Sequence, residues 1–369
     1  MTRMARTTPT TPVNAPAAQS ANVWINIRAV LALLVIIYHS TMIYSDPDGM
    51  YPTSRRLEFS GPGSPLATVI GVGFISMMPL FFGLAGSSMV YTLRKSTSYA
   101  VLMRKKLYRL VIPWLFIGLC WSIPLRFATH NPQFRGLSFG RILWETFVTG
   151  NFSDNLWFLQ VLFLMFVVTG LPYQLFRLTD RADVAVAVWS VFVFFAVVAG
   201  NHVLEAQGMT SKAVSSFIAN LPFFVAGLLV HRQWARIRRV LFAPRMRIVT
   251  IALLAVAYAL MFVIAMRVGD GLVHMYAMQI AAMPVPLAIA AIMPRRTNRV
   301  MGLIGKNLLS LYLMHLPLVY VSFAYWPNID PWLMILINVC FLSMVVMICA
   351  EVLRRLHLGV LIGEKGYRL

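Results

Sequence analysis

Arg28 and His39 are the first residues whose types and spacing indicate chemistry, in the segment NIRAVLALLVIIYHS. They are 11 residues apart, which in an α-helix is about 20° more than three full turns. Both side chains therefore share one helix face, about 16.5 Å apart along the axis. One interpretation is a path on which Arg28 holds an anion and His39 acts as a base. The alternative is an arginine anchor at the interface and a histidine satisfied by another helix.

Two further ionisable residues lie in apolar segments. His315 occurs in GKNLLSLYLMHLPLVYV, about 12 Å beyond the start of its predicted helix. Pro317 follows and would loosen the backbone hydrogen bonding there. Glu351 lies near the end of the last apolar segment. Ionisable groups are costly in a membrane helix and usually face a protein interior or a watery cavity, so a direct and a structural role both stay open for His315.

Six basic residues crowd positions 94–109, in LRKSTSYAVLMRKKLYRLVIP. If the segment is helical from Ala100, Lys106 and Arg109 share one face at a spacing of i, i+3. Such a cluster can hold phosphates through charge-assisted hydrogen bonds. Membrane topology and binding of anionic lipid explain the same charges equally well.

The elements that must position these residues are membrane helices. The chain has 369 residues, of which 59% are hydrophobic and 12% charged, whereas a soluble protein carries about 25% charged residues. A membrane helix needs about 17–25 apolar residues. The sequence therefore predicts an all-α, polytopic bundle of about ten helices with both termini in the cytoplasm. The expected spans are 24–44, 66–93, 110–127, 155–176, 184–200, 213–230, 248–266, 274–293, 307–325 and 332–353.

The charge distribution supports this topology. There are 32 basic and 12 acidic residues, a net charge of +20. With both termini inside, 25 basic residues fall in cytoplasmic segments and 7 outside, as the positive-inside rule requires. No nucleic-acid-binding signature accompanies the charge, so nucleic acid is not expected as a partner. We expect a cytoplasmic disordered tail over 1–23, a membrane domain over 24–353, a cytoplasmic tail over 354–369, and an interfacial segment within 128–154 around FGRILWETFV.

Several chemistries lack their sequence motifs. The chain has no HExxH and no CxxC, so a zinc-protease or thiol–metal centre is unsupported. It also lacks a Walker A motif, which argues against an ATP-driven pump. A transporter would require internal repeats, and the basic loop and the Arg28 to His39 segment have no second copy.

The motifs, taken in chain order, resemble those of the acyltransferase 3 family. Arg28 and His39 match its Arg-x10-His motif, and LFFGLAGSSMVYTLRK is similar to its FFxLSGF stretch, with Ala85 in place of Ser. RKKLYRLVIP resembles the family's Arg-x-x-Arg region, with Lys106 in the first Arg position and Arg109 in the second. NLWFLQVLF resembles the family's HLWFL segment, with Asn155 in place of His. LIGKNLLSLYLMHLPL resembles its LGxxSxxIYLxHxPL signature. Glu351 stands where a Glu-x-Pro often closes the last helix of the family, and here the Pro is missing. The resemblance covers about residues 24–353.

The resemblance implies transfer of an acyl group, usually acetyl, from cytoplasmic acyl-CoA to a hydroxyl of a cell-surface glycan or its lipid-linked precursor. It implies a multi-pass protein of the bacterial cytoplasmic membrane, in contact with lipids, with acyl-CoA as co-substrate and no permanently bound cofactor or metal. A lipid or a secondary metabolite is an alternative acceptor, and a transporter is the alternative from another class. The implied residues are His39 and His315 for catalysis, Arg28, Arg104, Lys106 and Arg109 for acyl-CoA, and Trp157 and Glu351 for the substrate.

Overall fold

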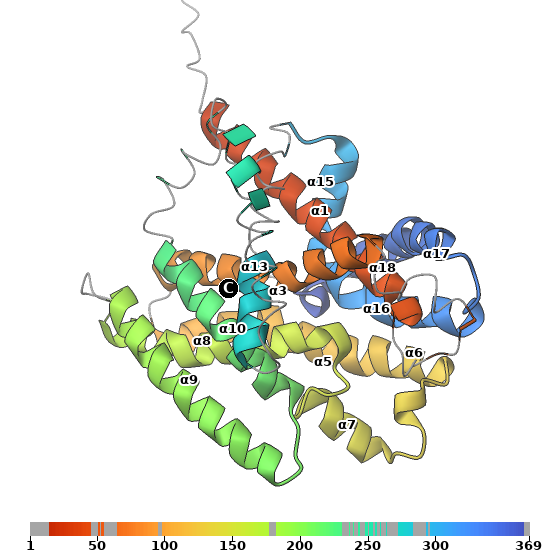
Figure 1. Cartoon of the computed structure of the whole chain (residues 1–369), viewed down its shortest axis with the longest axis horizontal. Helices are drawn as coiled ribbons and strands as arrows, with labels where there is room; N and C mark the ends of the chain where they lie inside the picture. Colours follow the sequence, from red (N-terminus) through yellow and green to blue (C-terminus); the bar gives the residue numbers. More distant parts are fainter. Residues whose placement is uncertain are drawn as a thin grey trace, which may run out of the picture.

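The chain forms a bundle of helices (Figure 1). The structure, a computed structural model, describes residues 15–45, 51, 53–54, 65–94, 98–176, 182–230, 272–282 and 296–364, with isolated positions between 236 and 263 and at 293. This part of the chain contains helices and no strand, which confirms the predicted all-α class for it. The physical reason is that long apolar segments in lipid must satisfy their backbone hydrogen bonds internally.

Fourteen α-helices are described, and their bounds follow the apolar segments of the sequence. They are α1 (Ala15–Ser45), α3 (Pro65–Arg94), α4 (Tyr99–Lys106), α5 (Ile112–Ile117), α6 (Ile123–Ala128), α7 (Phe139–Phe147), α8 (Trp157–Phe176), α9 (Ala182–Ala206), α10 (Lys212–Val230), α13 (Leu272–Ala282), α15 (Arg299–Lys306), α16 (Leu308–Tyr325), α17 (Pro331–Ile337) and α18 (Ser343–Arg355).

Short π-helical turns join several of these helices into continuous rods. One rod, Tyr99–Ala128, contains η1 (Leu107–Val111) and η2 (Gly118–Ser122), and another, Pro331–Arg355, contains η7 (Asn338–Leu342). In the first rod, Pro113 and Pro124 lie in the first turn of the α-helix that follows each π-turn. A proline removes one helical hydrogen bond, and local π-helical adjustment is a known way to satisfy the freed backbone groups in a membrane helix.

Seven helical segments of the described part are long and apolar enough to cross a membrane. They correspond to the predicted spans 24–44, 110–127, 155–176, 184–200, 213–230, 307–325 and 332–353. The predicted span 66–93 coincides with α3, within which Met77–Val90 is a shorter apolar stretch. The predicted spans 248–266 and 274–293 lie mostly outside the described residues. The count of about ten is therefore not confirmed, and the location of the termini stays a prediction.

Both ends of the described chain differ from the predicted tails. Helix α1 begins at Ala15 rather than at residue 24, because the segment after Pro16 is rich in alanine, the strongest helix former. Residues 1–14 lie outside the described residues. After α18, the 3₁₀-helix η8 (Gly359–Ile362) folds back against α5 and α16. Gly363 follows with φ +76°, and a Cβ there would approach the carbonyl oxygen of Arg109.

The centre of the bundle lies around α1, α3, α10 and α16. Helices α3 and α10 approach each other so closely that a Cβ on Gly86 or Gly227 would collide with backbone atoms of the other helix. Small residues allow this kind of backbone approach between membrane helices. Helix α9 instead lies along the edge of the bundle beside α8 and α10 (Figure 1). It exposes large apolar side chains such as Phe192 and Phe195, as a lipid-facing helix would.

Helix α7 is the amphipathic element expected within 128–154. Ile142 and Glu145 are buried, while Phe139 and Trp144 are exposed. Ser138 caps the helix by accepting a hydrogen bond from the backbone N–H of Arg141 at 3.3 Å. The exposed aromatic side chains suit the boundary between lipid and water.

Candidate active site

The two histidines singled out from the sequence meet in the middle of the bundle. His39 lies on α1 and His315 on α16, and the distance between His39 Nδ1 and His315 Nε2 is 2.9 Å. Their exposed fractions are 7% and 0%. The rings are tilted by 45° with centroids 4.9 Å apart. The sequence predicted each residue separately, and the structure brings them together.

The backbone of α16 fixes which ring nitrogens carry protons. His315 Nδ1 lies 2.8 Å from the carbonyl oxygen of Leu311 and 2.9 Å from that of Tyr312. Carbonyl oxygens only accept hydrogen bonds, so this nitrogen carries the proton. In a neutral ring, His315 Nε2 is then an acceptor, and His39 Nδ1 must donate to it. Neutral His39 therefore has its lone pair on Nε2, the nitrogen that points away from His315.

Polar contacts from other helices hold the α16 backbone beside His315. The Asn155 side chain donates from Nδ2 to the carbonyl oxygen of Tyr312, and the Tyr312 hydroxyl donates to the Asn155 carbonyl at 2.8 Å. The Trp121 indole donates to the Met314 carbonyl at 3.0 Å. The Tyr312 carbonyl thus accepts from both Asn155 and His315. This arrangement orients the histidine as outer partners orient metal-bound or catalytic histidines.

Aromatic side chains line the region next to Tyr312. The Phe158 ring lies edge-on to that of Tyr312 with centroids 5.4 Å apart, and Phe81 lies at 6.5 Å from it. Trp157, expected to bind substrate, stacks on Phe82 with centroids 6.0 Å apart and is partly buried. Its position one residue before Phe158 places it beside this aromatic group, and its contact with substrate stays a prediction.

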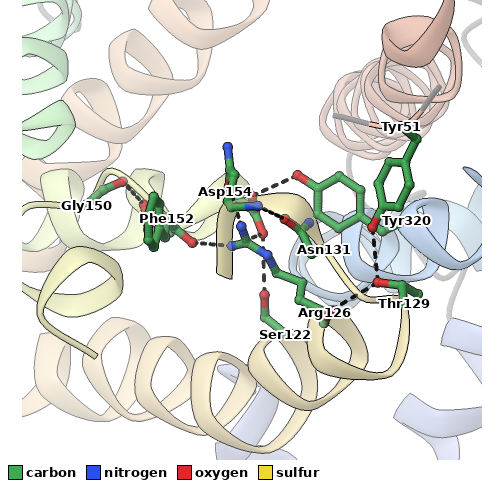
Figure 2. A network of polar contacts seen from close by, with 11 residues as sticks. Tyr51, Ser122, Arg126, Thr129, Asn131, Gly150, Phe152, Asp154 and Tyr320 are labelled. Atoms are coloured by element: carbon green, nitrogen blue, oxygen red, sulfur yellow. Dashed lines mark hydrogen bonds and ion pairs between the residues drawn. The ribbon is translucent and has the colours of Figure 1, made fainter. Parts of the chain in front are cut away.

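A buried ion pair joins Arg126 of α6 to Asp154, which lies shortly before α8, and the sequence did not predict it. The Arg126 guanidinium donates to Asp154 Oδ2 at 3.0 Å, with the two side chains 1% and 7% exposed. It also donates to the Phe152 carbonyl at 2.7 Å and to the Gln133 side-chain oxygen. The Tyr320 hydroxyl donates to Asp154 Oδ1 at 2.8 Å (Figure 2). The sequence did contain one indication of this network, because Arg126 is a charged residue inside the predicted span 110–127.

The network continues toward Tyr51, as Figure 2 shows. The Tyr51 hydroxyl donates to Thr129 Oγ1 at 3.1 Å. Burial raises the pKa of the Tyr51 phenol, so the hydroxyl stays a donor at neutral pH. Asp154 itself has a φ of +50°, a conformation that Asp tolerates better than most residues. The network thus ties the turn before α8 to the end of α16 that follows His315.

We call the opposite end of the bundle the basic end. It lies before His39 on α1 and before His315 on α16, and its residues are Arg28, Arg109, Asn307 and Arg354. Arg28 is exposed there, and the side chain of neighbouring Asn26 donates to the carbonyl of Arg296 at 3.0 Å. By helix rise, Arg28 lies about 16.5 Å from His39, as the sequence predicted.

The predicted shared face of Lys106 and Arg109 is corrected by the structure. Arg104 and Arg109 are exposed, but Lys106 is 8% exposed and places Nζ 3.4 Å from the centroid of the Phe166 ring. The cause is η1, whose wider π-helical turn changes the alignment of residues three apart. Lys106 therefore anchors this rod to α8 by a cation–π contact, and the exposed arginines are the ones available to a phosphate.

Glu351 lies on the exposed surface of α18 at the basic end. It pairs with Arg354 at 3.3 Å and with Arg355 at 3.5 Å. Arg354 also donates to Asn307 Oδ1 at 2.6 Å, which places Glu351 near the start of α16. His315 is eight residues after Asn307, which corresponds to about 12 Å along the helix axis. The predicted substrate contact of Glu351 therefore receives no support from the position of the histidine pair.

The described residues contain no group of three or more His, Cys, Asp or Glu side chains that could hold a metal ion. No curated protein and no solved structure matches the chain significantly. A protein-family model described as an acyltransferase domain matches residues 22–352, which include both histidines, the aromatic group and the buried ion pair. Because this match covers most of the sequence, the chain belongs to the acyltransferase 3 family.

Proposed function

We propose that this membrane acyltransferase moves an acetyl group from cytoplasmic acetyl-CoA to a hydroxyl of a cell-surface glycan or its lipid-linked precursor. The family match supports acyl transfer, and the seven apolar helices support a multi-pass location in a membrane. The observation that carries the proposal is the buried pair formed by His39 and His315. The pair supplies an imidazole of defined tautomer at the depth where donor and acceptor would meet.

In the proposed reaction, His39 Nε2 accepts the proton of the acceptor hydroxyl. The oxygen attacks the thioester carbonyl, the new C–O bond forms, and the C–S bond breaks. The His39 imidazolium then returns the proton to the departing thiolate, which gives free CoA thiol. His315 accepts the hydrogen bond from His39 Nδ1 throughout, so it stabilises the imidazolium and keeps the ring oriented. This is general acid–base catalysis with an orienting partner.

The donor would enter at the basic end. CoA carries several phosphate charges, and the exposed side chains of Arg28, Arg104 and Arg109 offer guanidinium groups that suit phosphate oxygens. The pantetheine arm would span the distance of about 16.5 Å from Arg28 to His39 along α1. In this account Lys106 supports the position of Arg109 rather than contacting the phosphates directly, because it faces Phe166.

The decisive experiment compares cells of the host that carry the natural protein, His39→Ala or His315→Ala, by mass spectrometry of ester groups on surface glycans. We expect His39→Ala to lower transfer at least about 100-fold, the range for loss of a general base. His315→Ala removes only the orienting partner and should lower transfer less. His202→Ala is the matched control, since the His202 side chain is 71% exposed and its ion-pair partner is nearby Glu205 on the same helix.

The membrane content of each variant is measured in parallel by immunoblot. Normal amounts of His39→Ala with full esterification would remove His39 from the mechanism. An unchanged ester pattern on deletion of the whole protein would exclude glycans as acceptors. Lipid extracts analysed from the same cells would then reveal an acylated lipid or secondary metabolite instead. Uptake of a labelled glycan into proteoliposomes without any acyl-CoA would favour the transporter alternative.

A further inference from the structure

Lys212 begins α10 at the end of the bundle that carries the Arg126–Asp154 ion pair. Its backbone N–H donates to Asn151 Oδ1 at 3.0 Å, and the next backbone N–H, that of Ala213, donates to the Thr149 carbonyl at 2.9 Å. The first turn of α10 is therefore docked on the turn that leads into Asp154. This docking brings the exposed Lys212 close to Asp154, whose contacts with Arg126 and Tyr320 are drawn in Figure 2.

The nearby carboxylate already has its own partners. Asp154 accepts from Tyr320 at Oδ1 and from Arg126 at Oδ2. The Lys212 ammonium lies close enough to interact electrostatically with Asp154, Arg126 and His39, yet within the described part of the chain it forms no ion pair. The charges of Arg126 and Asp154 cancel, so the group formed by Arg126, Asp154 and Lys212 carries one net positive charge.

The position of this cation is unusual for the chain. Most basic residues fall in the predicted cytoplasmic segments, and Lys212 is the only lysine predicted on the other side. Two of the other described cations at this end are paired with acidic groups: Arg126 with Asp154 and Arg141 with Glu145. An ammonium that forms no ion pair among the described residues attracts an anion, and its proximity to His39 places that anion next to the proposed reaction.

We propose that Lys212 binds a negatively charged group of the acceptor, a carboxylate or a phosphate, and thereby directs an acceptor hydroxyl toward His39. This inference rests on the proposed function and narrows its acceptor to anionic glycans. A uronic acid would supply the carboxylate, and a phosphorylated sugar or a lipid-linked sugar would supply the phosphate. Lysine acts here as a point charge, so either anion satisfies it.

The test uses the full-length protein in detergent, where both ends of the bundle are accessible, with radiolabelled acetyl-CoA as donor. Three acceptors are compared: octyl β-D-glucoside, octyl β-D-glucuronide and octyl β-D-glucoside 6-phosphate. The readout is the ratio of kcat/KM for each anionic acceptor to that for the neutral one. Lys212→Gln should lower the preferred ratio at least about tenfold, as loss of a charged hydrogen bond predicts, and Lys212→Arg should retain most of it.

Arg135→Gln is the matched control, because Arg135 is an exposed cation on the predicted outer side that this proposal does not use. It should leave both ratios unchanged. Preference for the glucuronide identifies a carboxylate, and preference for the 6-phosphate identifies a phosphate. Equal ratios for the natural protein and Lys212→Gln would overturn the inference.

A binding measurement separates this inference from the proposed function. Thermal stabilisation of the protein by each octyl sugar is recorded without acetyl-CoA. Stabilisation by an anionic sugar that is lost in Lys212→Gln supports the anion site even if acetyl transfer fails. Stabilisation that is equal for neutral and anionic sugars overturns the site, whether or not transfer to glucoside occurs.

Discussion

Replacement of Asp154 by Asn should destabilise the protein strongly, because it leaves the buried Arg126 charge without a counter-ion. The two charged groups are 3.0 Å apart and almost completely buried. At this distance and an effective dielectric constant of about 20, their attraction is about 5.5 kcal/mol. Removal of one partner from a buried pair typically costs about 3–5 kcal/mol. We therefore expect the free energy of unfolding of Asp154→Asn to fall by about that amount.

The assay is the thermal unfolding midpoint of detergent-solubilised protein, followed by intrinsic fluorescence. For a chain of this size, a loss of about 3–5 kcal/mol corresponds to a midpoint lower by about 5 °C. Arg355→Gln is the control because the Arg355 side chain is 80% exposed and its ion pair spans 3.5 Å. Exposed pairs contribute little, so this midpoint should shift by less than about 1 °C.

The double variant Arg126→Met, Asp154→Asn distinguishes the charge from the shape of the site. It removes the unpaired cation, and Asn still offers an oxygen to the Tyr320 hydroxyl. A neutral pair of similar volume is often as stable as a buried ion pair, so the double variant should recover most of the lost stability. An unchanged midpoint for Asp154→Asn, or a double variant less stable than the single one, would refute the electrostatic reasoning.

The remaining predictions concern positions in other parts of the bundle. Arg109→Gln should raise the KM for acetyl-CoA several-fold with little change in kcat, and the difference should shrink as salt rises, because an exposed cation is screened. Gly227→Val should lower the amount of folded protein in the membrane, since its side chain would meet the backbone of Gly83, whereas Gly140→Ala, which meets no atom within 4 Å, should not. Asn155→Ala should lower kcat more than it changes KM, because Asn155 supports the carbonyl that holds His315, and kinetics with acetyl-CoA measure both.

The local features of the fold were largely predictable from the sequence. The apolar segments predicted helices, and seven of them match spans in the described part of the chain. The amphipathic pattern of FGRILWETFV predicted α7. The starting point of α1 was less predictable, because alanine-rich residues before the apolar segment also favour a helix. The face of Lys106 was mispredicted, since a π-helical turn changes the angular spacing on which the argument depended.

The sequence alone determined which segments are helices and which rare ionisable residues they carry, because lipid penalises both unsatisfied backbone groups and unneeded charges. Only the tertiary structure decided that His39 meets His315 across 276 positions of the chain. The same holds for the partnership of Arg126 with Asp154 and for the place of Lys212 beside it. Periodicity within one helix fixes which face a residue occupies, whereas the neighbour that meets this face depends on how separate helices pack.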